Sequence, residues 1–349
     1  MYFLLFDTDA TADLVAHPEG YKGDVQVPAR VEYGGQVYQV KGLAPEVFMN
    51  CQALTSVVLP EGVTEVSESA FFGCKRLARV QLPEGLKEVH ENAFFGCEAL
   101  KSIVLPQSLT ALRENAFGGT GLTRITLPEG VTELRGGVFV QCKQLEQVDL
   151  PQSLTNLAEA TFLGCESLKS VRLPQSIGSI GMSAFWNCTS LSEIVLPEGL
   201  YHIGSVAFGG CVSLREIHLP STLQRLGEAV FSGCKGLKNI RIDAGIPPAM
   251  DVSGLQPQVS AFDEDTYANA VCEVPRESLE DYQRVDGWKS FAHLRAQNSN
   301  PTNIAQLLQQ HKEARIYNLQ GQRVAVSKAA FRDLPTGIYI VNGQKVYQP

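Results

Sequence analysis

Residues 77–99 decide the fold, and they read Leu-Ala-Arg-Val-Gln-Leu-Pro-Glu-Gly-Leu-Lys-Glu-Val-His-Glu-Asn-Ala-Phe-Phe-Gly-Cys-Glu-Ala. Val80 and Leu82 lie two residues apart, so their side chains share one face of a short strand. Pro83 has no backbone N–H and ends that strand. The stretch therefore begins with a short strand that turns apolar side chains to one side and stops at a defined residue.

The second half of the same stretch is expected to close a coil. Leu86 and Val89 point inward from a second short extended run, which follows a corner. Ala93, Phe94 and Cys97 then close the coil over its core through a tight helical turn. We expect every other coil to copy this scheme, so that like residues lie above like residues in columns.

Copies of this unit recur along most of the chain. Equivalent phenylalanines are 23 residues apart, except for one step of 22. Such a period is typical of a solenoid, because one unit cannot bury its apolar face alone and must stack on its neighbours. The sequence thus predicts a mainly β solenoid of about nine coils with short strands and helical turns. Its phenylalanine column comprises Phe48, Phe71, Phe94, Phe117, Phe139, Phe162, Phe185, Phe208 and Phe231.

Eight of the nine cysteines occupy one position of the repeat, and Thr120 takes that position in the 22-residue unit. A zinc site needs four ligands that converge on one point, which a column of residues one strand apart does not provide. Parallel side chains on neighbouring coils also hold their Cβ atoms too far apart for a disulfide. We therefore expect small buried thiols, with no metal or cofactor site. The column comprises Cys51, Cys74, Cys97, Cys142, Cys165, Cys188, Cys211 and Cys234.

We call the short strand that begins each coil its first strand. The side chains that flank the inward residue of each first strand are expected to face solvent. The inward positions hardly change from coil to coil, whereas these outward positions vary. We call this surface the first-strand face and interpret it as a partner-binding surface; the alternative is a face that is merely solvated. Its candidate partner-binding residues are Arg79, Gln81, Arg124, Thr126, Gln147, Asp149, Ser170, Arg172, Glu193, Glu216 and His218.

An open stack needs caps, because its ends would otherwise expose apolar core and unpaired strand edges. Alternating residues around a Gly-Gly pair predict a hairpin at Val31–Tyr38, within a β cap that starts with a strand at Met1–Phe6. The predicted order is an N-terminal β cap at 1–42, the solenoid at 43–242 and a C-terminal cap with a short helix at 243–296.

The C-terminal cap contains an expected N-cap and an aromatic plug. Ser278 with Asp281 is interpreted as an N-cap arrangement for the short helix. Trp288 and Phe291 follow and are expected to cover the last coil.

A composition change separates the last part of the chain. Residues 297–349 contain six cations and two acids, which gives them a charge of +4. Because the whole chain carries -8, the residues before 297 carry -12. Residues 297–312 are interpreted as a linker. Residues 313–349 are predicted to form a small β module that contains an Asn-Gly hairpin at Ile338–Val346.

The unit at 77–97 resembles the BspA-like leucine-rich repeats of surface proteins from anaerobic bacteria. The segments at 20–28 and 286–291 are similar to the pieces that begin and end such domains. The resemblance implies a leucine-rich-repeat solenoid and a role in adhesion, through binding of host extracellular matrix or other cells. That implication attaches to the repeat type and to no particular residue.

The tail resembles a second known module. Ile316–Val324 and Leu334–Val346 are similar to the C-terminal sorting modules of the Por (type IX) secretion route. The tail is short, and it ends in Val-Tyr-Gln-Pro rather than in a basic terminus. The resemblance implies that the protein is exposed outside the inner membrane.

These features favour a non-enzymatic, adhesin-like protein at the cell surface or secreted, with a host or cell-surface protein or glycan as its partner. The alternative is an envelope scaffold that contacts other bacterial proteins. An enzyme is not expected, since the six histidines are scattered and no His-Glu-x-x-His, Gly-x-Ser-x-Gly or phosphate-loop motif is present. Carboxylates such as Glu65 and Glu88 are interpreted as solvated surface groups.

Charge and hydropathy exclude further classes. A net charge of -8 argues against a nucleic-acid partner. The sequence contains no run of 18 apolar residues, so no transmembrane helix is expected. The apolar start at 1–6 lacks a basic leader and is not interpreted as a signal peptide.

Overall fold

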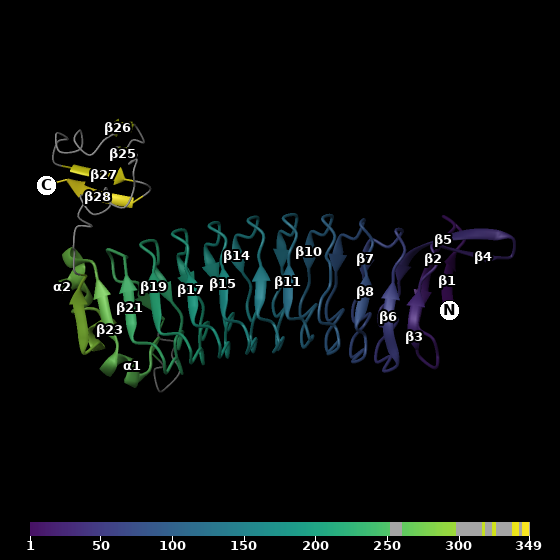
Figure 1. The fold of residues 1–349 in the computed structure, drawn as a ribbon, viewed down its shortest axis with the longest axis horizontal. Helices are drawn as coiled ribbons and strands as arrows, with labels where there is room; N and C mark the ends of the chain where they lie inside the picture. Colours follow the sequence, from purple (N-terminus) through teal and green to yellow (C-terminus); the bar gives the residue numbers. More distant parts are fainter. Residues whose placement is uncertain (252–259, 298–315, 318–322, 326–336, 342–343, 349) are drawn as a thin grey trace. The chain divides into compact units, whose positions relative to one another are not determined.

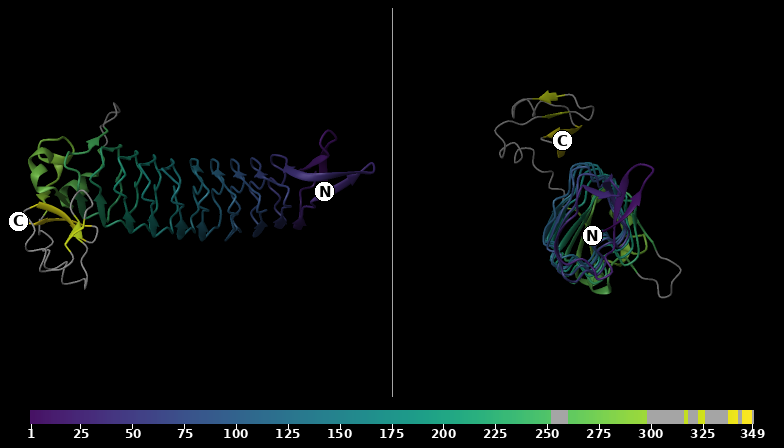
Figure 2. Two further views of the ribbon diagram at one scale, coloured as in Figure 1. Left: turned by 90° about the horizontal axis from the view of Figure 1, so that it is seen from above. Right: turned by 90° about the vertical axis from the view of Figure 1, so that its right-hand side faces the viewer.

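The computed structural model describes residues 1–251, 260–297, 316–317, 323–325, 337–341 and 344–348. The chain forms two compact units, Met1–Arg295 and Ala296–Pro349. The first unit is a solenoid of about ten turns in its described part, mainly strand, with a spacing of about 23 residues. Viewed along the stack, its coils superpose with a common outline (Figure 2, right).

Most coils begin with a first strand, and these strands pair in parallel with an equivalent strand of an adjacent coil in several short sheets (Figure 1). The register joins equivalent residues, so Arg124 lies beside Gln147 and Ser170 beside Glu193. The first strands are β3 (Gly23–Gln26), β6 (Leu54–Val58), β8 (Arg79–Gln81), β11 (Arg124–Thr126), β13 (Gln147–Asp149), β15 (Ser170–Arg172), β17 (Glu193–Val195), β19 (Glu216–Leu219), β21 (Asn239–Ile242) and β23 (Val271–Val274).

The expectation that every coil repeats the first strand is wrong for one coil. Residues 101–105 form no strand, so the ladder is interrupted between β8 and β11. It is also interrupted between β13 and β15 and between β17 and β19, where both strands are present. The interruption at 101–105 lies beside the 22-residue unit. There the amide of Gly121 donates to the carbonyl oxygen of Cys97, and a side chain at Gly121 would meet the carbonyl oxygen of Glu98.

A second set of strands, each two residues long, lines another side of the coils. These strands also pair in parallel, in the orders β12-β10-β9-β7 and β14-β16-β18-β20-β22. They are β7 (Glu65–Val66), β9 (Glu88–Val89), β10 (Ala111–Leu112), β12 (Glu133–Leu134), β14 (Asn156–Leu157), β16 (Ser179–Ile180), β18 (His202–Ile203), β20 (Arg225–Leu226) and β22 (Ala249–Met250).

The phenylalanine column forms the centre of the core, as predicted. The nine rings are fully buried, and neighbouring rings stack with centroids 4.9–6.0 Å apart. The widest gap, 6.0 Å, separates Phe117 from Phe139, on either side of the missing residue. Phe262 adds a tenth ring 5.0 Å from Phe231, which the regular period did not reveal. Each buried ring contributes roughly 1.5–3 kcal/mol of apolar burial.

The cysteine column is also buried, and the described cysteines are free thiols. Each thiol from Cys74 on donates to the carbonyl oxygen of the phenylalanine one coil earlier, for example Cys74 Sγ to Phe48 O at 2.9 Å. In the shortened unit, Thr120 Oγ1 donates to Phe117 O at 2.8 Å. The cysteines therefore fill space and also hydrogen-bond to carbonyl groups of the neighbouring coil. The seven thiol–carbonyl contacts involve Cys74, Cys97, Cys142, Cys165, Cys188, Cys211 and Cys234.

The coil closes through consecutive turns with two left-handed residues. At the first of these positions φ is 55° in Asn92 and 54° in Asn115, and the same position holds Val206 with φ 50°. Asparagine tolerates this region, whereas a β-branched side chain is strained there.

Val206→Asn is expected to stabilise the protein by about 1 kcal/mol, because the left-handed backbone costs an ordinary residue about 1–2 kcal/mol. Denaturant unfolding would show a higher midpoint with an unchanged slope. The matched control is Val212→Asn, at an exposed valine with an ordinary backbone conformation. If Val206→Asn were no more stable than the parent, the backbone at Val206 would not be strained.

The N-terminal end carries a four-stranded sheet in the order β1-β2-β5-β4. The predicted first strand and front hairpin are confirmed, and Gly34 and Gly35 both take left-handed φ values in the hairpin turn. The strands are β1 (Tyr2–Phe6), β2 (Thr11–Val15), β4 (Arg30–Tyr33) and β5 (Gln36–Leu43).

The C-terminal end is covered by aromatic side chains, as predicted. Trp288 and Phe291 are buried against Phe262, and Trp288 Nε1 donates to Pro248 O at 2.7 Å. The elements here are α1 (Glu264–Asn269), η1 (Arg276–Ser278), α2 (Leu279–Tyr282), η2 (Trp288–Ser290) and β24 (His293–Ala296). The prediction that the Ser278 side chain caps the short helix is wrong. Ser278 precedes α2 but makes no cap hydrogen bond, because its hydroxyl donates to Gly245 O at 2.6 Å.

The second unit contains four described strands in the order β26-β25-β27-β28. β27 and β28 pair antiparallel, as the Asn-Gly pair predicts, while that pair itself lies outside the described residues. The expected linker at 297–312 also lies outside them, except for Gln297. The strands are β25 (Ile316–Tyr317), β26 (Arg323–Ala325), β27 (Gly337–Val341) and β28 (Gln344–Gln348).

Candidate functional site

The first-strand face exposes the candidate residues chosen from the sequence. In each first strand the central residue turns into the core, as Val148 and Ile217 do, and its two neighbours turn outward because side chains alternate along a strand. All eleven candidates are exposed. The parallel register arranges them in two columns that follow the stack, one before and one after each inward residue.

Side-chain hydrogen bonds link neighbouring coils in the middle of this face. Arg124 Nε donates to Gln147 Oε1 at 3.0 Å, and Thr126 Oγ1 donates to Asp149 Oδ2 at 3.0 Å. Gln147 Nε2 in turn lies 3.4 Å from Asp149 Oδ1. Contacts between exposed polar groups are weak in water, so a partner could replace them at little cost.

Charge is unevenly distributed along the column that precedes the inward residues. Arg79 and Arg124 lie toward the N-terminal end, and Glu193 and Glu216 lie toward the C-terminal end. Within the described residues, neither of these two glutamates forms an ion pair. Their carboxylates are therefore available to an outside donor.

The ends of the face are tied by polar contacts to neighbouring elements. Near the N-terminal end, hydroxyl donors from Ser56 and Thr55 reach Asp24 at 2.6 and 2.8 Å and lower the pKa of its carboxyl group. Near the C-terminal end, His218 Nε2 lies 2.7 Å from an oxygen of Asp243, and Arg241 Nε donates to the same carboxylate at 3.2 Å.

The face is hollowed rather than flat. Shallow depressions lie along it in the described coils, among them depressions of about 530, 510 and 390 Å³. Arg79 and Gln81 line the first depression, Ser170 and Arg172 the second, and Glu193 lies between the second and the third. Glu216 and His218 also line the third. These sizes suit a protruding side chain or a sugar ring.

Two exposed valines add apolar surface beside the depressions. Val104 is 84% exposed and lines the first depression, and Val195 is 64% exposed and lines the other two. Both valines flank an inward residue and so lie on the face predicted to be exposed, although neither is among the eleven candidate residues. Their high exposure on an otherwise polar sheet suits a partner with a small apolar contact surface.

The structure also extends the face beyond the last candidate, His218. Arg241 and Glu273 line the third depression together with Val271, because β23 pairs with β21. A signal for this extension was present in the sequence, since Val274-Pro275 resembles the Leu-Pro pair found at the end of most first strands.

No helix in the described part of the chain is both long and apolar enough to cross a membrane.

Comparison with known proteins identifies the repeat. A leucine-rich repeat protein from Bacteroides ovatus is 27% identical, with 85% of this chain and 75% of that chain covered and a TM-score of 0.70. The T. pallidum leucine-rich repeat protein is 28% identical over 61% of this chain and 87% of that chain, with a TM-score of 0.46. No curated protein matches the chain in sequence. The model of the BspA type leucine-rich repeat region matches residues 41–169 and 159–247, well over half of the chain. The chain therefore belongs to the BspA type leucine-rich repeat family.

Proposed function

We propose that the protein is a non-enzymatic, adhesin-like binding protein, displayed at the cell surface or secreted. The first-strand face would bind a protein or glycan of the host matrix or of another cell. The observation that carries this proposal is the contrast between the two sides of each first strand. From β3 to β21 the inward residues are valine or isoleucine, whereas the exposed residues vary along the stack and border depressions.

The repeat type supports the same proposal. Leucine-rich-repeat solenoids are typically non-enzymatic, and proteins of this family are often surface or binding proteins. A stacked solenoid holds its exposed side chains at fixed spacings, which reduces the conformational entropy lost on binding. The tail at 313–349, which resembles a Por sorting module, would deliver the protein across the outer membrane.

Charge reversal on the face tests the proposal. The parent would be screened by biolayer interferometry against immobilised matrix proteins and glycans, and binding partners would be retested with Glu193→Lys/Glu216→Lys. We expect affinity to fall at least tenfold, because reversed charges at a contact both lose attraction and add repulsion. The Arg79→Glu/Arg124→Glu variant would show whether the N-terminal half of the face also takes part.

A matched control separates the face from general charge effects. Glu61→Lys/Glu114→Lys changes the net charge equally at exposed residues outside the first strands and should leave affinity within about twofold. Equal binding by the parent and both face variants would refute the proposed surface. Binding confined to envelope proteins of the producing cell would instead favour the scaffold function.

A further inference from the structure

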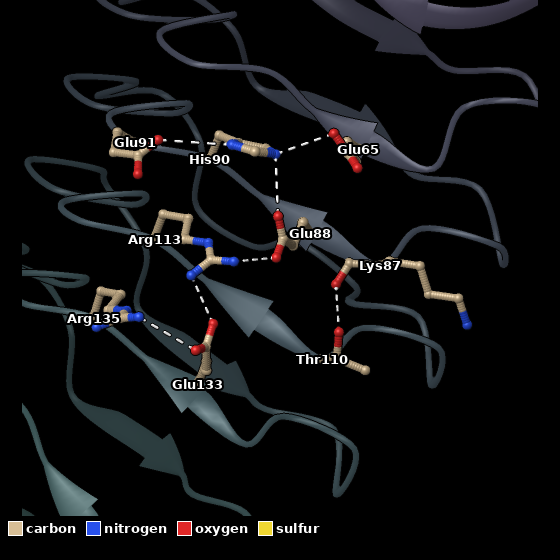
Figure 3. Close-up of polar contacts among 9 residues, drawn as sticks. All are labelled: Glu65, Lys87, Glu88, His90, Glu91, Thr110, Arg113, Glu133 and Arg135. Carbon is tan, nitrogen blue, oxygen red and sulfur yellow. Dashed lines mark hydrogen bonds and ion pairs between the residues drawn. The ribbon is translucent and has the colours of Figure 1, made fainter.

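A group of polar side chains outside the first-strand face converges on one point of the second strands (Figure 3). Glu65 of β7 and Glu88 of β9 are direct register partners, so two carboxylates lie side by side on adjacent strands. Like charges directly across a strand pair repel unless something lies between them. His90, two residues after Glu88, turns its ring toward both carboxylates.

The three candidate ligand atoms lie close together. His90 Nε2 lies 3.2 Å from Glu65 Oε2 and 3.2 Å from Glu88 Oε2, and all three atoms lie within 4.8 Å of one another. A tetrahedral ion with ligand bonds of about 2.1 Å would hold its ligand atoms about 3.4 Å apart. One imidazole nitrogen carries at most one proton and cannot serve both carboxylates well. A cation placed between the three atoms would serve all of them.

Neighbouring side chains orient the ligands. The other ring nitrogen of His90, Nδ1, lies 3.7 Å from a carboxylate oxygen of Glu91, as in metal sites where a carboxylate supports the histidine. Arg113 binds the second oxygen of Glu88 and turns the first toward His90. The side chains of Glu88 and His90 are only 22% and 28% exposed, so their positions are restricted by packing.

The local charge also matches a divalent cation. Glu65, Glu88 and Glu91 carry three negative charges, and Arg113 neutralises one of them. Glu133, further along the column, accepts ion pairs from both Arg113 and Arg135, at 2.6 and 3.3 Å. These side chains leave an excess of about two negative charges around His90, which a divalent ion would balance.

We propose that Glu65, Glu88 and His90 form a binding site for a divalent transition-metal ion such as Zn²⁺. An imidazole ligand beside two carboxylates favours zinc-type ions over Mg²⁺ and Ca²⁺, which prefer oxygen ligands alone. Three protein ligands leave a fourth position for water or for a group from outside. The sequence led to the expectation of no metal site because the histidines are scattered along it and Glu65 and Glu88 were interpreted as solvated surface groups. The register of β7 and β9 brings these ligands together.

Calorimetric titration of the metal-free full chain with Zn²⁺ tests the site. We expect one Zn²⁺ ion bound per chain at this position, and a loss of affinity of at least tenfold in Glu65→Gln and in His90→Gln. Bound Zn²⁺ should also raise the melting temperature of the parent, but not that of His90→Gln. The melting temperature of each variant without metal shows whether it folds.

His202→Gln is the matched control. His202 occupies the same set of second strands, between Ser179 and Arg225, with no carboxylate as register partner. Its replacement should leave the affinity for Zn²⁺ within about twofold. Absence of Zn²⁺ binding, or binding that is as tight in His90→Gln and Glu65→Gln as in the parent, would overturn the site. In that case His90 acts only as a hydrogen-bonding partner of the carboxylates.

Discussion

Raising the pH from 8 to 10 is expected to unfold the solenoid, because the cysteine column cannot ionise inside the core. Burial raises the pKa of Cys74, Cys188 and Cys234 to about 12 and that of Cys142 to about 11, against an ordinary value of 9.0. Burial also raises the pKa of the remaining column thiols and of Cys272. Unfolding exposes all of these groups to water.

The direction follows from the order of the two pKa values. The folded-state pKa lies above the unfolded value, so the neutral thiols stabilise the fold fully below pH 9. That contribution is lost as the pH rises from 9 towards 12, because the unfolded chain alone releases protons. Each thiol loses about 1.4 kcal/mol per pH unit in this window. The eight thiols from Cys74 to Cys272 together lose on the order of 10 kcal/mol by pH 10, comparable to the whole stability of a typical domain.

Denaturant unfolding at a series of pH values would measure this loss. Ultraviolet absorbance of thiolate should appear together with the loss of circular dichroism and not before it. Ellman's reagent at pH 8 should react only slowly with the native protein. After unfolding, it should react readily with all nine thiols. Thiolate that forms while the coils remain intact, or stability that is constant between pH 8 and 10, would contradict a buried column.

Phe162→Ala is expected to lower the free energy of unfolding by about 3–5 kcal/mol. The ring is fully buried between Phe139, at 5.6 Å, and Phe185, at 5.4 Å. Its removal leaves a cavity in the middle of the column, and stacked coils on either side hold the walls apart. Because each coil contacts only its neighbours, the weakened interface would also reduce the cooperativity of unfolding.

Phe72→Ala provides the comparison. Phe72 stacks on Phe95 at 5.4 Å, but both rings are partly exposed outside the column. Loss of this ring should cost about 1–2 kcal/mol, since less apolar area returns to water. Equal unfolding midpoints of Phe162→Ala and the parent in urea would show that the column is not a main source of stability.

Local, repeated features could be predicted well from the sequence. The period placed Phe94 and Cys97 in the core because an in-register stack puts equivalent residues in equivalent environments. The same reasoning identified the exposed candidates of the first-strand face, such as Arg124 and Glu193. Their role in binding a partner stays a prediction.

Features that depend on departures from the period could not be predicted. Phe262 continues the column, but the insertion before it hides its spacing. The hydroxyl of Ser278 bonds Gly245 instead of its own helix, which requires two segments 33 residues apart to meet. Pattern reasoning sees neighbours in sequence, whereas these contacts join segments that only the folded cap brings together.

The sequence by itself determined the coil, its period and the identity of its core columns, because alternation within a strand and repetition between strands are local rules. Only the tertiary structure decided where the ladder stops at 101–105, where the first-strand face is hollowed and how Glu65, Glu88 and His90 converge. Those outcomes depend on side-chain rotamers and on small shifts between stacked coils. Neither of these is set by the period of 23 residues.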